Sequence, residues 1–158
     1  MARLFLHGTS GAVACPAAST AKVIYQLITT ANIRVAIQGW GVSFQGVSST
    51  DSPILCRLTR STLGTTGAVG TSSINKKNPD DAETVQTTCN ATWGTPPAAG
   101  TTVEEFYVHP QTGYYKFYPQ GQEIMIGGSA ITYFAFEVTT GATITGTPNV
   151  TFEVDLEE

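Results

Sequence analysis

Polar and apolar residues alternate with a period of two along most of this chain, a pattern typical of β-strands and not of helices. Alternating segments lie at 22–29, 33–45, 54–60, 103–109, 114–118, 123–126, 131–138 and 150–156. In the last of them the even positions are Val, Phe, Val and Leu, while the odd positions between them are polar. About eight short strands joined by polar turns predict an all-β, single-domain antiparallel sandwich or barrel.

The longest segment, IRVAIQGWGVSFQG (33–46), changes its alternation partway along. Apolar residues hold the odd positions as far as Ile37 and the even positions from Trp40 onward. A one-residue slip sends every later side chain to the opposite face of a sheet. The change therefore predicts a β-bulge at Gly39 and Trp40 that keeps both halves on one core. We expect a positive φ at Gly39, so that Gly39→Val would cost about 1–3 kcal/mol.

A glycine-rich ligand loop is the alternative interpretation of the same stretch. It fits worse, because GWGVSFQG does not match G-x-G-x-x-G and no helix is predicted after it. The stretch GWGVSFQG itself contains no basic residue that could hold a phosphate. The pattern therefore favours a scaffold over a phosphate site.

Two stretches do not follow the strand pattern. Residues 1–21 are mostly small and polar, and we expect an extended N-terminal arm that buries little against its own subunit and reaches over a neighbour. The sandwich domain is then expected at 22–158. Within it, 61–102 forms a long polar excursion with one short possible strand at 84–88. An excursion of this length is usually functional or part of an interface.

The composition narrows the range of partners. Charged residues make up 13% of the chain, about half the usual fraction for a soluble protein. A neutral, hydroxyl-rich surface suits packing against other proteins, although a plain β-sandwich can look similar. The net charge is −4 and no run of Lys or Arg exists, so nucleic acid and anionic membrane are poor candidates. No apolar run approaches the ~20 residues that span a bilayer.

The N-terminus and the cysteines indicate in which cellular compartment the chain is made. The only apolar run near the start is LFL, which His7 interrupts, whereas a secretory core needs ~7–15 apolar residues. We therefore expect synthesis in the cytoplasm. The three widely spaced cysteines, Cys15, Cys56 and Cys89, fit reduced thiols better than a disulfide framework.

Residues that could carry catalysis are few. His7 lies in the expected arm, and His109 precedes Pro110 at the end of a predicted strand, where a locally bonded histidine is ordinary. The chain has no G-x-S-x-G, CxxC or HExxH motif. Glu104 and Glu105 would point to opposite faces of a strand, which is wrong for a glycosidase pair. We therefore expect a protein that is not an enzyme and has no cofactor and no metal.

One acidic turn needs separate mention. Asp80, Asp81 and Glu83 in the excursion could supply oxygen ligands to calcium. A solvated turn facing Lys76 and Lys77 is the simpler interpretation, and we prefer it.

Aromatic residues give the strongest functional signal. The stretch FYVHPQTGYYKFYP places aromatic side chains on both faces of two neighbouring strands, and the core accounts for about half of them. Segment 131–138 is apolar on both faces and so requires cover on both. A subunit interface would supply that cover, and an exposed sugar-stacking platform is the alternative. The expected interface residues are Tyr107, Tyr114, Tyr115, Ile131 and Tyr133.

The order of these patterns resembles a known class of protein. The series IQGWGVSFQGVSSTDSPILCRLTRSTLGTT, NKKNPDDAETVQTTCNATW and EEFYVHPQTGYYKFYPQGQEIMIGGS, followed by a last strand ending in Glu-Glu, resembles small virion proteins of tailed bacteriophages. It is most similar to the jelly-roll decoration (cement) proteins that sit as trimers on capsids. The resemblance covers most of 22–158. The excursion at 61–102 is longer than in the most compact examples, which leaves the mode of attachment open.

This resemblance implies a jelly-roll-like sandwich that acts as a homotrimer on the major capsid protein, at the capsid surface of a virion. Such a protein would stabilise the head by bridging capsomers, and the family has no catalytic residues to carry over. A glycan- or receptor-binding module of a head fibre or tail is the first alternative, favoured if an exposed aromatic pair borders a groove. A small β-fold enzyme is the second, favoured only if a histidine meets a carboxylate in a pocket.

Overall fold

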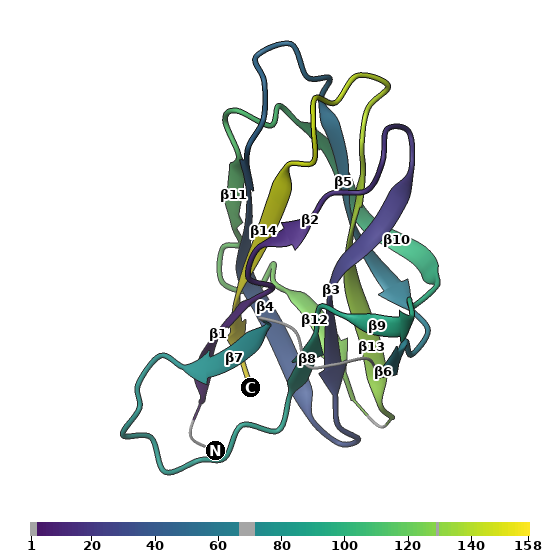
Figure 1. Ribbon diagram of the computed structural model, residues 1–158. Helices are drawn as coiled ribbons and strands as arrows, with labels where there is room; N and C mark the ends of the chain where they lie inside the picture. Colours follow the sequence, from purple (N-terminus) through teal and green to yellow (C-terminus); the bar gives the residue numbers. More distant parts are fainter. Residues whose placement is uncertain (1–2, 67–71, 129) are drawn as a thin grey trace.

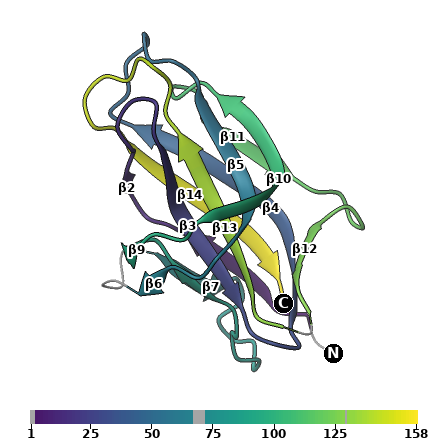
Figure 2. The same ribbon diagram turned by 90° about the vertical axis from the view of Figure 1, so that its right-hand side faces the viewer.

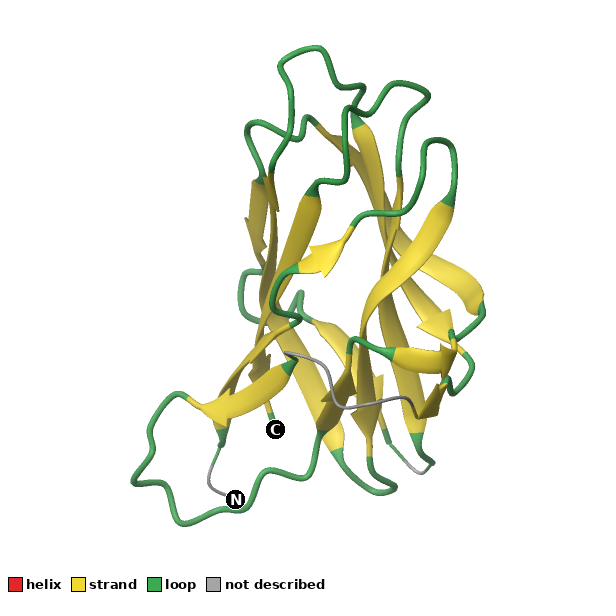
Figure 3. Cartoon of the chain, in the orientation of Figure 1, coloured by secondary structure: helices red, strands yellow, loops and turns green. Residues whose placement is uncertain are grey.

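The computed structural model describes residues 3–66, 72–128 and 130–158, which are all strand, turn or loop (Figure 3). The strands in these ranges are β1 (Phe5–Thr9), β2 (Val13–Ala14), β3 (Ala21–Thr29), β4 (Arg34–Gln45), β5 (Ile54–Ser61), β6 (Thr65–Thr66), β7 (Ser73–Lys76), β8 (Thr88–Asn90), β9 (Trp93–Thr95), β10 (Ala99–Val108), β11 (Tyr114–Phe117), β12 (Ile124–Gly127), β13 (Thr132–Thr139) and β14 (Asn149–Glu157). The all-β prediction is confirmed. Among the described residues no helix is long and apolar enough to cross a membrane.

Two antiparallel sheets face each other across one core (Figures 1 and 2). The seven-stranded sheet has the order β11–β4–β14–β1–β7, with β12 also paired to β4 and β2 to β14. The five-stranded sheet has the order β10–β5–β13–β3–β8, and β6 and β9 form a separate ribbon. This arrangement is the β-sandwich that the period-two pattern predicted.

The connectivity is that of a jelly roll. β11 and β12 both pair with the same side of β4 and act as one strand interrupted by a turn. We count that strand once and leave out the short strands β2 and β6–β9. The path then runs from β1 to β3, β4, β5, β10, β11/β12, β13 and β14. Along this path only β5 and β10 are successive strands of the same sheet. The resulting orders, β1–β14–β4–β11 facing β3–β13–β5–β10, are the two interleaved Greek keys of a jelly roll.

Aromatic rings from both sheets fill the core. The rings of Phe136 on β13 and Phe152 on β14 stack with their centroids 4.2 Å apart. Trp40 on β4 is fully buried, and its ring lies 4.7 Å from that of Phe106 on β10. Burying side chains of this size contributes about 1.5–3 kcal/mol each, so these contacts hold the two sheets together.

The predicted bulge is present on β4. Asp155 of β14 lies opposite Gly39, but its neighbour Leu156 lies opposite Ile37, so Gln38 is the extra residue. The extra residue restores the alternation for the second half of the strand. Ile37 is 1% exposed, and both halves of β4 face the core as predicted.

The expected backbone angle at the bulge is wrong. Gly39 is not among the glycines with positive φ. The reason for a glycine here is space: a Cβ atom would lie 3.0 Å from the carbonyl oxygen of Lys116 and 3.0 Å from the hydroxyl of Tyr115. The neighbouring strand β11, and not the torsion of β4, therefore requires the glycine.

The expectation that residues 1–21 bury little against their own subunit is also wrong. β1 pairs with β14 on one side and β7 on the other, and Leu4 and Leu6 are only 3% and 0% exposed. Only Leu4 and Leu6 alternate toward the core here, and two such residues are too few to predict a strand from the sequence. β14 would otherwise present an unpaired edge, and β1 covers it.

The polar excursion is partly integrated into both sheets. β7 extends the seven-stranded sheet beyond β1, and β8 extends the five-stranded sheet beyond β3, slightly later than the strand expected at 84–88. After β5 the chain folds back over β3, where the amide nitrogen of Gln26 donates to the hydroxyl of Ser61 and the carbonyl of Thr62, both at 2.8 Å. This segment of the same chain helps to cover the outer face of β13, where Ala135 is 1% exposed.

Candidate binding face of the seven-stranded sheet

The five residues predicted for a subunit interface do not form one surface. Tyr114 and Tyr115 lie on β11 in the seven-stranded sheet, whereas Tyr107 lies on β10, an edge strand of the other sheet. Ile131 and Tyr133 lie at the start of β13, at the end of the five-stranded sheet away from Tyr107. Tyr107, Tyr115 and Ile131 are 73%, 56% and 53% exposed. Their interface role stays a prediction, but it cannot be a role in one compact patch.

A different set of apolar side chains shares the outer face of the seven-stranded sheet. Tyr115 lies opposite Gly41 and Phe117 opposite Gly39 in the β11–β4 ladder. Since Trp40 between the two glycines points into the core, all four point away from it. Ladder register places two further exposed residues of β1 and β12 on this face, giving Phe5, Tyr115, Phe117 and Met125.

The ring of Tyr115 lies directly on the backbone of β4. A Cβ atom at Gly41 would be 2.7 Å from Cδ2 of this ring, and one at Gly39 would be 3.0 Å from its hydroxyl oxygen. The side chain therefore covers both glycines, with the Cδ2 edge of its ring at Gly41 and its hydroxyl at Gly39, and 56% of the residue stays exposed. Gly39 and Gly41 together provide a surface without side chains, called here the glycine floor, on which the Tyr115 side chain lies. This explains why glycines flank Trp40 in the sequence.

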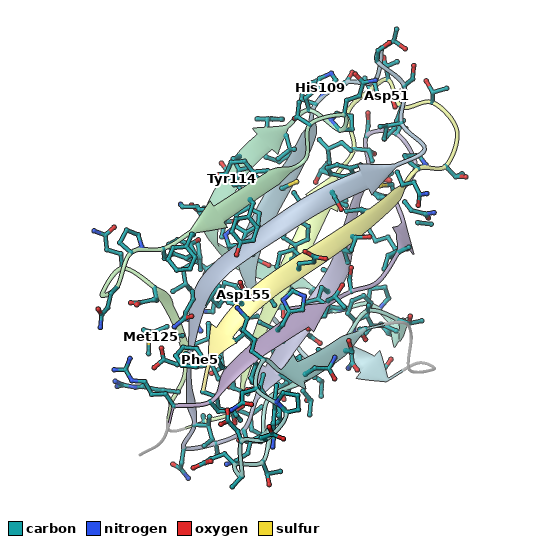
Figure 4. All side chains as sticks on the ribbon, turned by 90° about the vertical axis from the view of Figure 1, so that its left-hand side faces the viewer. Phe5, Asp51, His109, Tyr114, Met125 and Asp155 are labelled. Carbon is teal, nitrogen blue, oxygen red and sulfur yellow. The ribbon has the colours of Figure 1, made fainter. Side chains whose placement is uncertain are left out.

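Asp155 on β14 holds this ring in place. The tyrosine hydroxyl donates to Oδ2 of Asp155 at 2.9 Å, and Oδ1 accepts from Nζ of Lys77 at 2.8 Å and Nδ1 of His7 at 3.0 Å. Burial alone would raise the pKa of Asp155, but the donors Lys77, His7 and Tyr115 outweigh it and lower that pKa. The pKa of Tyr115 is raised by burial first and by the bond to Asp155 second. Figure 4 shows Asp155 near the middle of this face.

Hollows adjoin the aromatic pair. One of about 510 Å³ lies beside Tyr115 and is lined by residues that include Ser43, Thr112, Thr151 and Glu153. A second, of about 270 Å³, borders Phe117 and includes Gln38 and Gln120 in its lining. A third, of about 300 Å³, shares Gln120 with the second and reaches Met125. Together they follow β4 along the edge of the sheet.

A second polar cluster closes the side of the sandwich between β10 and β11. Nε1 of Trp40 donates to the hydroxyl of Tyr118 at 3.0 Å. Both Tyr118 and Lys116 donate to the carboxylate of Glu104. Burial alone would raise the pKa of Glu104, but the bonds from Lys116 and Tyr118 outweigh it and lower that pKa. Glu105 faces the other way and bonds Arg57 at 3.1 Å, so the two neighbours do point to opposite faces as predicted.

The two histidines have ordinary partners. His7 lies on β1 and not in a free arm, and within the described part of the chain its side chain bonds only Asp155. His109 accepts a bond from the backbone N–H of Gln111 at 3.3 Å, the local bonding expected at that strand end. His7 does meet a carboxylate, but no hydroxyl or thiol among the described residues bonds its ring, so the pair lacks the nucleophile of a triad.

The cysteines are free thiols, as predicted. Burial raises the pKa of Cys15 to about 11 and that of Cys56 to about 12, so both stay protonated at neutral pH. Among the described residues no group of three His, Cys, Asp or Glu side chains is placed to hold a metal ion. What the arrangement offers is a binding face with an immobilised aromatic ring.

No protein-family model, no curated protein and no solved structure matches this chain. The resemblance to phage decoration proteins therefore stays a prediction. Analysis of the sequence missed Phe117, His7, Lys77 and Asp155 as parts of a binding face. The pairing of each glycine with an aromatic residue was the one available signal, and it depends on the register between β4 and β11.

Proposed function

We propose that this chain is a non-enzymatic virion protein of the tailed-bacteriophage type that attaches to a larger surface through the outer face of its seven-stranded sheet. The observation that carries the proposal is the exposed pair Tyr115 and Phe117, of which the first is fixed on a glycine floor by Asp155. Neighbouring exposed aromatic rings on a sheet face typically mark a contact surface.

The first form of this function is capsid decoration. The jelly-roll topology and the low charge of the chain support it, together with the resemblance in pattern to decoration proteins. As a homotrimer at the capsid surface, the protein would bridge copies of the major capsid protein, and these added contacts must break before the shell ruptures. Many weakly bound copies together give a large stabilisation through multivalency.

The second form is a glycan- or receptor-binding module of a head fibre or tail. A specific observation favours it: the exposed Tyr115 borders a hollow of about 510 Å³ that is lined with hydroxyl groups and a carboxylate, and Phe117 borders the next hollow. Exposed aromatic rings beside polar groups suit a ligand that has both apolar and hydroxyl surfaces.

Reconstitution tests the attachment surface directly. Particles that lack the protein are mixed with the purified wild type, with the double variant Tyr115→Ala/Phe117→Ala, or with Thr50→Ala. We expect the double variant to co-sediment at least about tenfold more weakly than wild type. Thr50→Ala is the control, because it changes an exposed residue of the turn between β4 and β5 that belongs to neither group of exposed apolar side chains. Equal attachment of all three proteins, or no attachment of the wild type, would remove the proposal.

A further inference from the structure

We infer that the outer face of the seven-stranded sheet binds a neutral oligosaccharide, with one sugar ring stacked on the exposed ring of Tyr115 and its hydroxyl groups bonded to Glu153 and its polar neighbours. The inference rests on the proposed role of this face in attachment and names the chemical class of the ligand. It follows from five features of the described residues: the exposure of a ring, its rigidity, the polar groups beside it, the local charge and the length of the face.

The exposure of the ring suits a sugar. The Cδ2 edge of the Tyr115 ring rests on Gly41 and its hydroxyl reaches over Gly39, while 56% of the residue stays exposed. An aromatic face carries negative charge density, and the C–H groups on one side of a pyranose ring are weakly positive. An exposed ring beside the hollow of about 510 Å³ lets such a sugar reach the ring from solvent.

The ring is already immobilised before any ligand arrives. Its hydroxyl donates to Asp155 at 2.9 Å, and Asp155 is itself held by Lys77 at 2.8 Å and His7 at 3.0 Å. Ordering a free side chain on binding costs roughly 0.5–1.5 kcal/mol, and this contact network removes most of that cost. Asp155 accepts hydrogen bonds from three donors, which is more support than a tyrosine that only covers two glycines would require.

The polar groups beside the ring suit hydroxyl groups. Glu153 lies opposite Gly41 on β14, across the glycine from Tyr115. In the described part of the chain no hydrogen bond or ion pair reaches its carboxylate, which is left to accept from a ligand. The hydroxyls of Ser43 and Thr151 line the same hollow of about 510 Å³, a volume within the usual range for ligand sites.

The charge of the face selects against acidic sugars. Glu153 lies on β14 beside the floor, and Glu123 lies in the hollow next to Phe117. Arg3 in that hollow pairs with Glu157 at 3.0 Å, and Lys77 and His7 are engaged with Asp155. Among the described residues, therefore, no cation pairs with Glu153 or Glu123. A sialylated or uronic saccharide would be repelled, whereas a neutral one would not.

The length of the face indicates an oligomer and not a single sugar. Phe117 lies two residues beyond Tyr115 on β11, about 7 Å along the strand, and is 62% exposed. The second hollow begins at Phe117 and the third continues to Met125, with Gln120 lining both. A chain of several sugars laid along β4 would use both rings and the amide groups beyond them.

The test uses the ¹⁵N-labelled full chain and four named probes: cellohexaose, maltohexaose, hexa-N-acetylchitohexaose and 3′-sialyllactose, each at millimolar concentration. We expect at least one neutral hexasaccharide to shift the amide signals of β4, β11 and β14, and the sialylated probe to shift none of them. Absence of a shift with every neutral probe overturns the inference.

Variants separate stacking from a purely structural role of the ring. Tyr115→Ala is expected to weaken the affinity for the bound saccharide at least about tenfold, and Glu153→Gln about threefold or more. Glu153→Gln changes no contact within the fold, so it keeps the test valid if Tyr115→Ala is unstable. Tyr107→Ala is the control that should leave affinity unchanged. Unchanged affinity in both Tyr115→Ala and Glu153→Gln places the saccharide elsewhere and overturns the inference.

The outcome is distinguishable from the fate of the proposed function. Loss of particle attachment in the double variant, with no saccharide bound by the wild type, makes this face a protein contact and overturns the saccharide inference alone. If the wild type binds a saccharide and the double variant still attaches to particles as strongly as wild type, the saccharide inference stands and the proposed attachment surface is wrong.

Discussion

Gly39 and Gly41 show how single residues decide the character of a sheet face. Each lies opposite an aromatic residue of β11, and each lacks the Cβ atom that would collide with it. Cross-strand pairs of an aromatic residue with a glycine cover exposed backbone and stabilise a sheet. The same contacts leave 56% of Tyr115 exposed, so these two positions shape the candidate binding face as well as the stability of the sheet.

Gly39→Val is expected to lower the free energy of unfolding by about 1–3 kcal/mol. The cause is crowding against the backbone carbonyl of Lys116 and the ring of Tyr115, both 3.0 Å from the new Cβ atom. Urea denaturation followed by tryptophan fluorescence measures the change. Ser43→Val, an exposed position on the same face of β4, is the control and should change stability by less than about 0.5 kcal/mol. If Gly39→Val and wild type have equal free energies of unfolding, β11 shifts without energetic cost and the steric argument is wrong.

Glu104→Gln is expected to destabilise the protein by about 1–2 kcal/mol at pH 7, because charge-assisted bonds from Lys116 and Tyr118 are weakened. Denaturation curves provide the measurement. Glu105→Gln is the matched control: it lies next in sequence, faces the opposite side and forms an exposed pair worth little. Similar losses in both variants would show that the buried network contributes nothing particular.

The pH dependence of stability follows from the same carboxylate. The pKa of Glu104 is lower in the folded state than its ordinary value of about 4.3, so the unfolded chain binds more protons in acid. Its stabilising contribution is full above about pH 5 and is lost as the pH falls through the folded pKa. Wild type should therefore lose more stability than Glu104→Gln between pH 6 and pH 3, as measured by urea denaturation at each pH. The pKa of Asp155 is also lowered in the folded state, so the Glu104→Gln variant should still lose some stability in acid.

At the scale of elements, β1 is the strand whose role changed most between sequence and structure. It lies inside the seven-stranded sheet between β14 and β7, and it carries His7 to Asp155. The segment therefore belongs to the fold and to the binding face together. Removing it would expose the edge of β14 and dismantle the support of Tyr115.

Leu6→Ala on β1 is expected to cost about 2–5 kcal/mol, because Leu6 is fully buried in the core. Phe5→Ala on the same strand should cost less than about 1 kcal/mol, since Phe5 faces outward and is 38% exposed. Thermal melts of the two variants give the comparison. Deletion of residues 2–10 should prevent folding, and an unchanged melting temperature in that deletion would restore the free-arm hypothesis.

At the scale of the whole molecule, exposed apolar side chains divide between two regions. Phe5, Tyr115, Phe117 and Met125 share the outer face of the seven-stranded sheet. Tyr114 of β11 is 40% exposed but turns its ring toward Trp40. The remaining exposed large apolar residues in the described ranges lie on or near the five-stranded sheet: Leu63, Val103, Tyr107 and Ile131. Two separate regions allow one surface for self-association and another for a ligand or a capsid.

We expect the purified protein to form a homotrimer, with about three times the 16.7 kDa mass of one chain by light scattering. Apolar residues of the five-stranded sheet would lie in the contact, which needs about 800 Å² per partner to be stable. Tyr107→Ala combined with Ile131→Ser should then shift the mass toward the monomer, while Tyr115→Ala should not. A wild type that remains monomeric at tens of micromolar would contradict the trimer and weaken the decoration form of the function.

Much of the fold could be predicted from the sequence because its information is local. Alternation predicted the inward residues of β14, and the parity change at Gln38 and Gly39 predicted the bulge. A strand with a period of two has only two faces, so its pattern specifies which residues lie inside. Short strands such as β1 carry too few apolar residues for this logic, and their pairing depends on the edge that they cover.

The candidate site depended on relations that no local pattern contains. Tyr115, Gly41, Glu153 and Thr9 lie side by side only because β11, β4, β14 and β1 are adjacent in the sheet, and the residues come from distant parts of the chain. The sequence by itself determined an all-β sandwich, free thiols and a bulged long strand. Only the tertiary structure decided that the flanking glycines support a ring, that Asp155 fixes it, and that His7 belongs to the same face. The physical reason is that strand order is set by packing of the whole core, whereas the direction of each side chain is set by its own strand.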